Sequence, residues 1–575
     1  MSDDLDRPRL PRRNFLMKTA VTSAAVAVNS AFGTVPGIAA TAPRKWDKEA
    51  DVVIIGSGIA GVSASIDAAD AGAKVIVLEK DPQPGGAAKF SGGHMTAAGT
   101  HIQARLNIED KPDWLYEAMM QDSEMTAVPE LVRKYVDNGP EQIVWLEHQG
   151  IKFTDYFLAG GADRIKEGVG RGHQIAQSPD YPGGPHRGGL GIMLMLFKSA
   201  NKRGVSTLLR HKMTRLVRTE EGGPVVGVEV DSGGNKLTIK ANRGVVVTTG
   251  GWSGNLLMGL AEDPRLTPDI YPDCWPYRLC LGEGHIAAVD VGAELSNMAY
   301  GGYLPLRWGT KVYQIWEPQT FTTVPSINVG VPIADFQRVI LVKSDGRRYV
   351  NEMLGDARVS PPGYPKLSSS QSDFPAHPFN ESYLNLQERP RNVWAVTDAE
   401  GAQSLGWQLH IEQVRNPNPK FGIALFPEMV AFSDSLKDLA VKMKVDPAGL
   451  EATVTRYNRF VDARKDDDFG KPDPTNKIAQ GPFFAVKLAL LKHTRRNGIR
   501  VNTRGQVLDR ADLLGTRDIP FETISIDHEK TIPHLYAAGE CAHYLGRYHT
   551  HGTLGIYSFY GRVAGKNAAA EKRLP

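Results

Sequence analysis

Cysteine is scarce in this chain, which has only three cysteines among its 575 residues. Cys274, Cys280 and Cys541 are too few for a disulfide framework or a thiolate-rich metal cluster. The motif C-x-x-C-H, which attaches c-type haem, does not occur. These absences exclude disulfide-stapled domains and covalent haem proteins.

An excess of charge of one sign and long apolar runs are also lacking. Lys and Arg number 67 against 64 Asp and Glu, whereas a nucleic-acid-binding domain is normally strongly basic. Outside the N-terminal region, no apolar run approaches the roughly 20 residues of a membrane span. The composition, with 41% hydrophobic residues and 59 glycines, is typical of a large globular protein of several domains. We therefore expect no nucleic-acid partner and no stable membrane span.

The first 42 residues differ from the rest of the chain. The run Arg12-Arg13-Asn14-Phe15-Leu16 precedes a weakly apolar stretch that ends in small residues near Ala42. This pattern resembles a twin-arginine signal peptide, although Pro11 and the late Lys18 depart from the usual form. It implies a signal peptide over residues 1–42, recognition by the twin-arginine translocase and a periplasmic location. A basic tail in front of the folded domain is the alternative.

Residues 51–79 have the pattern of a strand, a glycine turn, a helix and a second strand. The turn is Gly56-Ser57-Gly58-Ile59-Ala60-Gly61, and the second apolar run ends at Glu79. Gly56 permits the tight turn, Gly58 admits a pyrophosphate to the helix N-terminus, and Gly61 allows close packing of helix on sheet. Glu79 can accept hydrogen bonds from ribose hydroxyls. Together these features predict a dinucleotide-binding βαβ unit.

Further segments indicate which dinucleotide is bound. They are GGAAKFSGG (85–93), VVVTTGGWSGN (245–255), GRRYVNE (346–352), LYAAGE (535–540) and GRVAGKNAA (561–569). With these segments in this order, the chain from about residue 48 resembles the superfamily of FAD-dependent fumarate reductases and 3-ketosteroid 1-dehydrogenases. The resemblance implies FAD as the cofactor, because NAD-dependent Rossmann enzymes lack further glycine segments of this kind after the first βαβ unit.

The resemblance also implies an architecture. We expect an α/β fold with a Rossmann-like FAD-binding domain built from residues 48–265 and 485–575. An α+β capping domain for the substrate, residues 266–484, is expected to be inserted between them. The implied FAD contacts are Gly56, Gly58, Ile59, Ala60, Gly61, Glu79, Lys80, Gly86, Ala87, Ala88, Ser91, Gly92, Gly93, Met213, Thr249, Gly250, Gly251, Glu540, Thr553, Leu554, Gly555 and Ile556.

Catalysis in this superfamily passes a hydride between flavin N5 and one carbon of a double bond, while a protein group handles the proton at the other carbon. In the fumarate reductases the proton donor is an arginine eight residues past the equivalent of Arg348, where this chain has Asp356. Arg358 follows two positions later. It is a candidate proton donor if the loop is locally rearranged, and otherwise a surface or salt-bridging arginine.

Two further segments match substrate-binding parts of the superfamily. His493 begins a His-Thr pair at the start of a substrate turn, where it can polarise a carbonyl or carboxylate; the alternative is a structural histidine. Arg547, Tyr548, His549 and His551 lie in the turn before a helix whose N-terminus is expected to face the flavin. The two histidines could suggest a metal pair, but no Cys or carboxylate lies nearby, so we predict no metal.

The leading interpretation is an exported FAD enzyme that reduces or forms an activated C=C bond next to a carbonyl, in an enone or enoate. A 3-ketosteroid 1-dehydrogenase-like enzyme for a bulky cyclic ketone is an alternative, favoured by the aromatic residues between Trp275 and Trp316. A third possibility is an electron-transfer subunit without a substrate site. Because the chain lacks a haem motif, the electrons are expected to come from, or go to, a separate partner.

Overall fold

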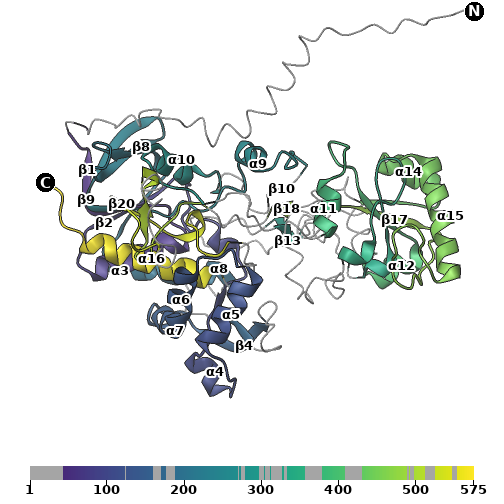
Figure 1. The fold of residues 1–575 in the computed structure, drawn as a ribbon, viewed down its shortest axis with the longest axis horizontal. Helices are drawn as coiled ribbons and strands as arrows, with labels where there is room; N and C mark the ends of the chain where they lie inside the picture. The colour runs from purple at the N-terminus through teal and green to yellow at the C-terminus, as the bar shows by residue number, and fades with distance from the viewer. Residues whose placement is uncertain are drawn as a thin grey trace, which may run out of the picture.

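The computed structural model describes most of the chain after residue 42. The described residues are 43, 45–123, 125–159, 170–176, 188–269, 271–272, 279–296, 303–304, 311–312, 327–328, 333, 335–355, 378–407, 430–488, 491–492, 498–511, 525–546 and 553–575. Most of them gather in two bodies, and the short strands β10 (Tyr271–Pro272), β13 (Ile327–Asn328) and β18 (Leu491–Lys492) are labelled between these bodies in Figure 1. One contains elements from both ends of the chain, and the other contains the elements between about residues 335 and 488.

A largely parallel sheet forms the centre of the first body. Its strand order is β19 (Gln506–Leu508), β20 (Thr531–Ala537), β9 (Asn235–Val247), β1 (Lys48–Ile55), β2 (Val75–Glu79) and β6 (Ser206–Leu209). The strands from β20 to β6 are parallel, and β19 is antiparallel to β20. A hairpin of β7 (Lys212–Arg218) and β8 (Val225–Ser232) extends the sheet from β9. The second half of β1, Val52–Ile55, is apolar and buried, as is usual for a parallel strand with both faces covered.

Two helices that are far apart in the sequence pack closely on this sheet. Helix α3 (Ile59–Asp70) follows β1, and α16 (Leu554–Ala570) is the last helix. A Cβ atom at Gly561 would overlap the carbonyl group of Ala60, and one at Gly565 would overlap that of Ala64. Glycine at these two positions therefore brings the helix backbones together, and a buried Ser63–Ser558 hydrogen bond of 2.8 Å joins the same faces.

The remaining elements of the first body surround the parallel sheet. They are helices α4 (His101–Arg105), α5 (Pro112–Asp122), α6 (Pro129–Asp137), α7 (Gly139–His148), α8 (Gly188–Lys202) and α9 (Leu256–Glu262), with a small sheet of β3 (His94–Thr96), β5 (Gly170–Ile175) and β4 (Phe153–Ala159). Residues 279–296, which include α10 (Glu283–Asp290), bond to this body through the bridges Ala293–Asp509 and Leu295–Ile499. They fall within the range that the sequence predicts for the capping domain.

The second body has a four-stranded antiparallel sheet, ordered β14 (Ile340–Val342), β15 (Trp394–Thr397), β17 (Phe483–Lys487) and β16 (Val430–Ser433). Alternate side chains enter two separate cores, so both faces of the sheet are buried. Helices α14 (Leu436–Met443) and α15 (Pro447–Ala463) contribute to one core; α11 (Pro378–Leu384) and α12 (Ala399–Ser404) contribute to the other. We call this body, with its two cores, the capping body.

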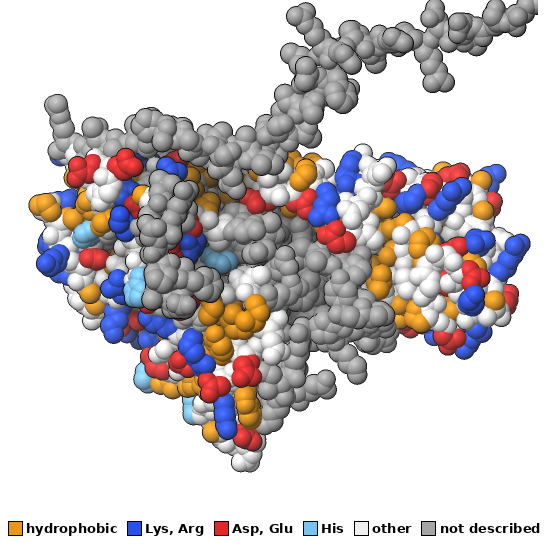
Figure 2. Space-filling view, in the orientation of Figure 1, with side chains coloured by type: hydrophobic (Ala, Val, Ile, Leu, Met, Phe, Trp, Pro, Cys, Tyr) orange, Lys and Arg blue, Asp and Glu red, His pale blue; other side chains and the backbone are white. Residues whose placement is uncertain are grey.

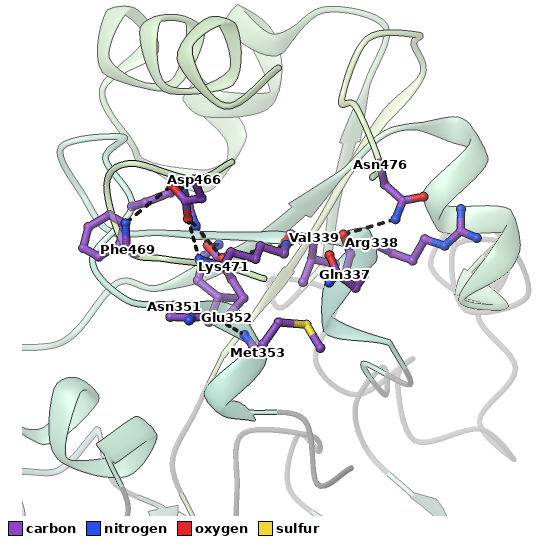
Figure 3. A network of polar contacts seen from close by, with 12 residues as sticks. Gln337, Arg338, Val339, Asn351, Glu352, Met353, Asp466, Phe469, Lys471 and Asn476 are labelled. Atoms are coloured by element: carbon purple, nitrogen blue, oxygen red, sulfur yellow. Dashed lines mark hydrogen bonds and ion pairs between the residues drawn. The ribbon is translucent and has the colours of Figure 1, made fainter. Parts of the chain in front are cut away.

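Four buried charged side chains join separate segments of the capping body, and we call them the charge cluster: Arg348, Glu352, Asp466 and Lys471. Figure 3 shows Glu352, Asp466 and Lys471 of this cluster. Arg348 donates to Glu352 at 2.8 and 2.7 Å and to Asp466 at 3.1 and 2.8 Å. Lys471 Nζ lies 3.7 Å from Glu352 and donates to the Val339 carbonyl at 2.8 Å. The positive and negative charges are equal in number, so the cluster is neutral as a whole.

Burial and bonding act in opposite directions within the charge cluster. Burial lowers the pKa of Lys471 to about 8, although Glu352 acts to raise it. Burial also opposes ionisation of Asp466, but the bonds from Arg348 outweigh it and hold the pKa of Asp466 below its usual value. Removing one member would therefore leave a buried charge without its partner, which is much more costly than the pair itself is stabilising.

The surface carries both signs of charge. On the face shown in Figure 2, Lys and Arg side chains are intermixed with Asp and Glu side chains over both bodies. Within the described ranges, no helix combines the length and the apolar character that crossing a membrane requires.

Candidate active site

The turn between β1 and α3 has the shape of a phosphate site. Gly56 has a φ of +102°, and a Cβ atom there would overlap the carbonyl of Thr248. A Cβ atom at Gly61 would overlap the carbonyl of Gly56, so helix and turn approach each other closely. At Gly58, by contrast, a Cβ atom would meet no heavy atom within 4 Å, and no side chain caps the helix start. The turn thus leaves open space at a helix N-terminus, where an anion is stabilised.

Glu79 lies at the end of β2 and is held by this turn. Its Oε2 accepts from the Ser57 backbone N–H at 3.1 Å and from the Ser57 hydroxyl at 2.5 Å, and its Oε1 accepts from the Asp81 N–H at 2.9 Å. An ionised carboxylate has about four acceptor sites. One acceptor site on Oε1 therefore remains for a hydroxyl group, which fits the ribose of a dinucleotide.

The predicted residue Met213 lies near Glu79. The carbonyl of Glu79 accepts from the His211 N–H at 2.8 Å, and β7 begins at the next residue. Met213 is buried. The hydrogen bond from His211 thus places the start of β7 beside the end of β2, and the contact of Met213 with FAD stays a prediction.

Lys80 and Glu283 form an ion pair of 2.7 Å beside the same strand end. Glu283 is the first residue of α10, and a Cβ atom at the next residue, Gly284, would overlap the hydroxyl of Thr249. Sequence reasoning identified Lys80 and Thr249 but missed Glu283. An acid between Gly282 and Gly284, ahead of a helix rich in small residues, was the available signal.

The segment of residues 85–93 lies against the turn between β1 and α3, residues 56–61, which we call the phosphate turn. A Cβ atom at Gly86 would lie 3.2 Å from the Cα atom of Gly58. Ala88 begins a short 3₁₀ helix (Ala88–Phe90), and the Ser91 hydroxyl donates to its carbonyl at 2.8 Å. The start of α8 packs on this segment, since a Cβ atom at Gly93 would overlap Gly188. The predicted residues Gly86, Ala87, Ala88, Ser91, Gly92 and Gly93 thus form one continuous wall next to the turn.

The segments of residues 245–255 and 535–540 also contact each other. A Cβ atom at Gly251 would lie 2.5 Å from Oε1 of Glu540, and the Ala538 N–H donates to the Val247 carbonyl at 2.9 Å. Cys541, also at this junction, donates from its buried thiol to Val247 at 3.3 Å. Burial raises the pKa of Cys541 to about 12, so it is a neutral packing group at ordinary pH.

The start of α16 lies against β3. Thr553 forms a bridge with Met95, and a Cβ atom at Gly555 would overlap the hydroxyl of Tyr135, which donates to the Thr96 carbonyl. The predicted residues Thr553, Leu554, Gly555 and Ile556 are therefore next to the 85–93 wall. The helix N-terminus again has no side-chain cap.

His173 supports β3 from β5. Its Nδ1 lies 2.9 Å from the Arg171 carbonyl and 3.2 Å from the Met95 carbonyl, and its Nε2 lies 2.8 Å from the Thr100 hydroxyl. Because carbonyls only accept, Nδ1 carries the hydrogen and Nε2 accepts from Thr100. Burial lowers the pKa of His173 to about 4, so this histidine is neutral near pH 7.

All six residues proposed for catalysis lie outside the described residues: Arg358, His493, Arg547, Tyr548, His549 and His551. Their roles stay predictions, as does the contact of each named residue with FAD. The described neighbours are Gly546, which lies against Thr126, and Lys492, which pairs with Pro272 and Tyr303. Within the described ranges, no group of three or more His, Cys, Asp or Glu side chains is arranged to hold a metal ion.

An uncapped helix start, a buried acid with a free acceptor site and three converging glycine segments fit a dinucleotide cofactor. Residues 51–556 match the family described as the FAD binding domain. The chain belongs to this family. FAD is its cofactor, and the protein is an FAD-dependent oxidoreductase. The expected cofactor is thus confirmed.

The similarity to known proteins extends over nearly the whole chain. A fumarate reductase (cytochrome) of Shewanella frigidimarina is 27% identical over 552 residues, which cover 93% of this chain and 81% of the relative. The acrylate reductase flavoprotein subunit of Shewanella woodyi is 27% identical over 564 residues, which cover 92% of each chain. The solved open conformation of a flavocytochrome c3 fumarate reductase superimposes with a TM-score of 0.68 at 24% identity, covering 91% of this chain and 79% of that structure. This similarity confirms the expected fold class.

Proposed function

We propose that this member of the FAD binding domain family reduces, or forms, a carbon–carbon double bond next to a carbonyl or carboxylate group. The observation that carries the proposal is the match to the acrylate reductase flavoprotein subunit over 92% of each chain. The two proteins thus share the capping segment as well as the FAD-binding segments. An electron-transfer subunit without a substrate site would not need such a segment.

FAD, when bound, supplies hydride transfer at flavin N5. The open space at Gly58 and the N-terminus of α3 would hold the pyrophosphate, and the remaining acceptor site on Glu79 would bind a ribose hydroxyl. The N-terminus of α16 would stabilise negative charge near the flavin.

In this proposal, His493 and residues 547–551 bind the substrate and polarise its carbonyl or carboxylate group. Arg358 gives the proton to the carbon that does not receive the hydride. Since the chain contains no C-x-x-C-H motif, a separate redox partner exchanges electrons with it.

Stopped-flow measurement of the two flavin half-reactions tests this function. Reduced holoprotein is mixed with acrylate, fumarate or a cyclic enone, and oxidised holoprotein with the saturated analogues. We expect an enoate or enone to reoxidise the flavin. His493→Ala should slow this step by about 10²–10³-fold, because one preorganised donor to a developing negative charge is lost. FAD content and dithionite reduction should be unchanged.

His528→Ala, at an exposed histidine, is the matched control and should behave like the wild type. Wild-type kinetics in His493→Ala would remove that residue from the site and leave residues 547–551 as the better candidates. If no enoate or enone reoxidised the flavin, the proposed reaction class would be wrong.

We further propose that the protein is exported to the periplasm through the twin-arginine pathway. The support is the Arg12-Arg13 pair and the weakly apolar stretch that follows it. Replacing both arginines with lysine should leave active holoprotein in the cytoplasm. The same replacement at Arg7 and Arg9, which lie in the same basic region, should leave export intact. Periplasmic activity that is equal in both variants would contradict the proposal.

A further inference from the structure

The capping body contains a cavity of about 380 Å³ that includes none of the residues assigned to FAD or to catalysis. It lies between the edge strand β16, the C-terminal end of α14 and the neighbouring ends of β15 and β17. Its volume is within the range of about 300–1,000 Å³ that is usual for small-molecule sites. The lining residues are Asn392, Trp394, Val430, Ala431, Phe432, Lys442, Met443, Lys444 and Lys487.

Three lysines line this cavity, and no aspartate or glutamate does. Lys442 Nζ donates to the Phe432 carbonyl at 2.7 Å and lies 5.4 Å from the centre of the Phe432 ring. Within the part of the chain that the structure describes, none of the three ammonium groups forms an ion pair with a carboxylate. The cavity is therefore bordered by three lysines whose ammonium groups have no carboxylate partner among the described residues, an arrangement that favours an anion there.

The carboxylates that are close in sequence to the lining residues, or that bond to them, form hydrogen bonds with groups other than the three lysines. Asp438 accepts from the Ser435 hydroxyl at 2.8 Å, and Asp446 accepts from two backbone N–H groups at the start of α15. Glu388 accepts from the Asn392 N–H at 3.3 Å. These acids cap helices or hold backbone, so their bonds do not reach the lysines.

The carbonyl groups at the C-terminal end of α14 are bonded by Asn392 and not by the lysines. The Asn392 amide donates to the carbonyls of Met443 and Lys444 at 3.0 and 3.1 Å, and its oxygen accepts from Trp394 Nε1 at 2.9 Å. The helix carbonyls are thus satisfied by a neutral group. The buried Trp394 and Met443 give the cavity a fixed apolar wall.

We propose that this cavity binds a small organic anion with two or more negative charges, its apolar part against Phe432 and Trp394 and its charges on the three lysines. The inference is independent of the reaction at the flavin. Carboxylates and phosphates both carry the negative charge that the lysines would bind. The experiment therefore tests one anion of each kind separately.

Calorimetric titration of the holoprotein with citrate and with ADP tests the proposal, with adenosine as an uncharged comparison. FAD occupies its own site in the holoprotein, and an unchanged flavin spectrum during the titration shows that this site is not involved. We expect citrate, ADP or both to bind with a Kd of about 1 mM or below, and adenosine not to bind. Binding of citrate alone would assign a carboxylate ligand, and binding of ADP alone a phosphate ligand.

Lys442→Met and Lys487→Met should each raise the Kd by about tenfold or more, because each removes one charged hydrogen-bond donor. Lys437→Met, an exposed lysine of α14 outside the lining, is the control and should leave the Kd unchanged. In a second measurement, the bound anion should protect Lys442, Lys444 and Lys487 from acetylation, as read by mass spectrometry. The absence of binding at about 10 mM, or equal affinity in all three variants, would overturn the proposal.

Discussion

The hydroxyl group of Ser57 donates to Glu79 at 2.5 Å and accepts from the Gly85 backbone N–H at 3.1 Å. One hydroxyl thus connects the turn between β1 and α3, the carboxylate of Glu79 and the segment of residues 85–93. Ser57→Ala would leave the buried Gly85 N–H without this acceptor, at a cost of about 1–3 kcal/mol. We expect a matching loss in the free energy of unfolding of the apoprotein and at least about a fivefold rise in the Kd for FAD.

Denaturant unfolding and fluorescence titration with FAD measure the two effects. Ser65→Ala is the control, because Ser65 is buried in α3, the helix that follows Ser57, and its hydroxyl bonds within that helix, to the Val62 carbonyl. It should leave FAD affinity unchanged. Equal FAD affinity in Ser57→Ala and the wild type would show that the Ser57 bridge does not position the site.

A valine at Gly58 should abolish FAD binding without disrupting the protein. The side chain would enter space that no protein atom occupies within 4 Å of its Cβ, and this is the space assigned to the pyrophosphate. The ratio of flavin to protein absorbance should fall to near zero, while circular dichroism of the apoprotein stays normal. Gly61→Val should instead impair folding, since its Cβ would overlap Gly56. Stoichiometric FAD in Gly58→Val would contradict this assignment of the turn.

Glu352→Gln should strongly destabilise the capping body. The substitution leaves the buried charges of Arg348 and Lys471 with Asp466 as their remaining acidic partner in the cluster. Breaking a buried ion pair by removing one member costs about 3–5 kcal/mol. Denaturant unfolding should show this loss, whereas Glu451→Gln, at an exposed position on α15, should change stability by less than about 0.5 kcal/mol. Similar values for the two variants would refute a structural role for the charge cluster.

His173 should make stability depend on pH in the acidic range. Its pKa is about 4 in the folded protein and ordinarily 6.5, so the unfolded chain binds more protons between these values. Stability therefore falls as the pH decreases through this window, by about 2 kcal/mol at about pH 5. His173→Phe should reduce the difference in unfolding free energy between pH 7 and pH 5 by that amount. An unchanged difference would mean that His173 is protonated in the folded protein.

Local patterns in the sequence predicted local structure well. The strand, glycine turn, helix and strand of residues 51–79 are present, and Gly56 and Gly61 are required at close approaches. The start of α15 likewise depends on local residues, since the Asp446 side chain caps the helix and Pro447 is its first residue. These features succeed because hydrophobic periodicity and capping depend on residues close together in the chain.

Long-range relationships were less accessible. Glu283 was missed because its partner, Lys80, lies 203 residues away and the ion pair exists only once α10 packs beside β2. Residues 279–296, which are expected from the sequence in the capping domain, bond to the parallel-sheet body through contacts with residues 499 and 509, and the domain boundary at residue 265 stays a prediction. The charge cluster joins Arg348 to Asp466 across 118 residues and leaves no local pattern.

The packing of α3 on α16 sets an order of events during biosynthesis. Ser63 in α3 and its partner Ser558 in α16 are 495 residues apart. The ribosome therefore makes α3 long before it makes α16, the helix that packs on it. Until Gly561 and Gly565 have emerged, the face of α3 at Ala60 and Ala64 lacks the helix that packs on it. A polypeptide cut short before α16 would therefore present this face of α3 to chaperones and proteases.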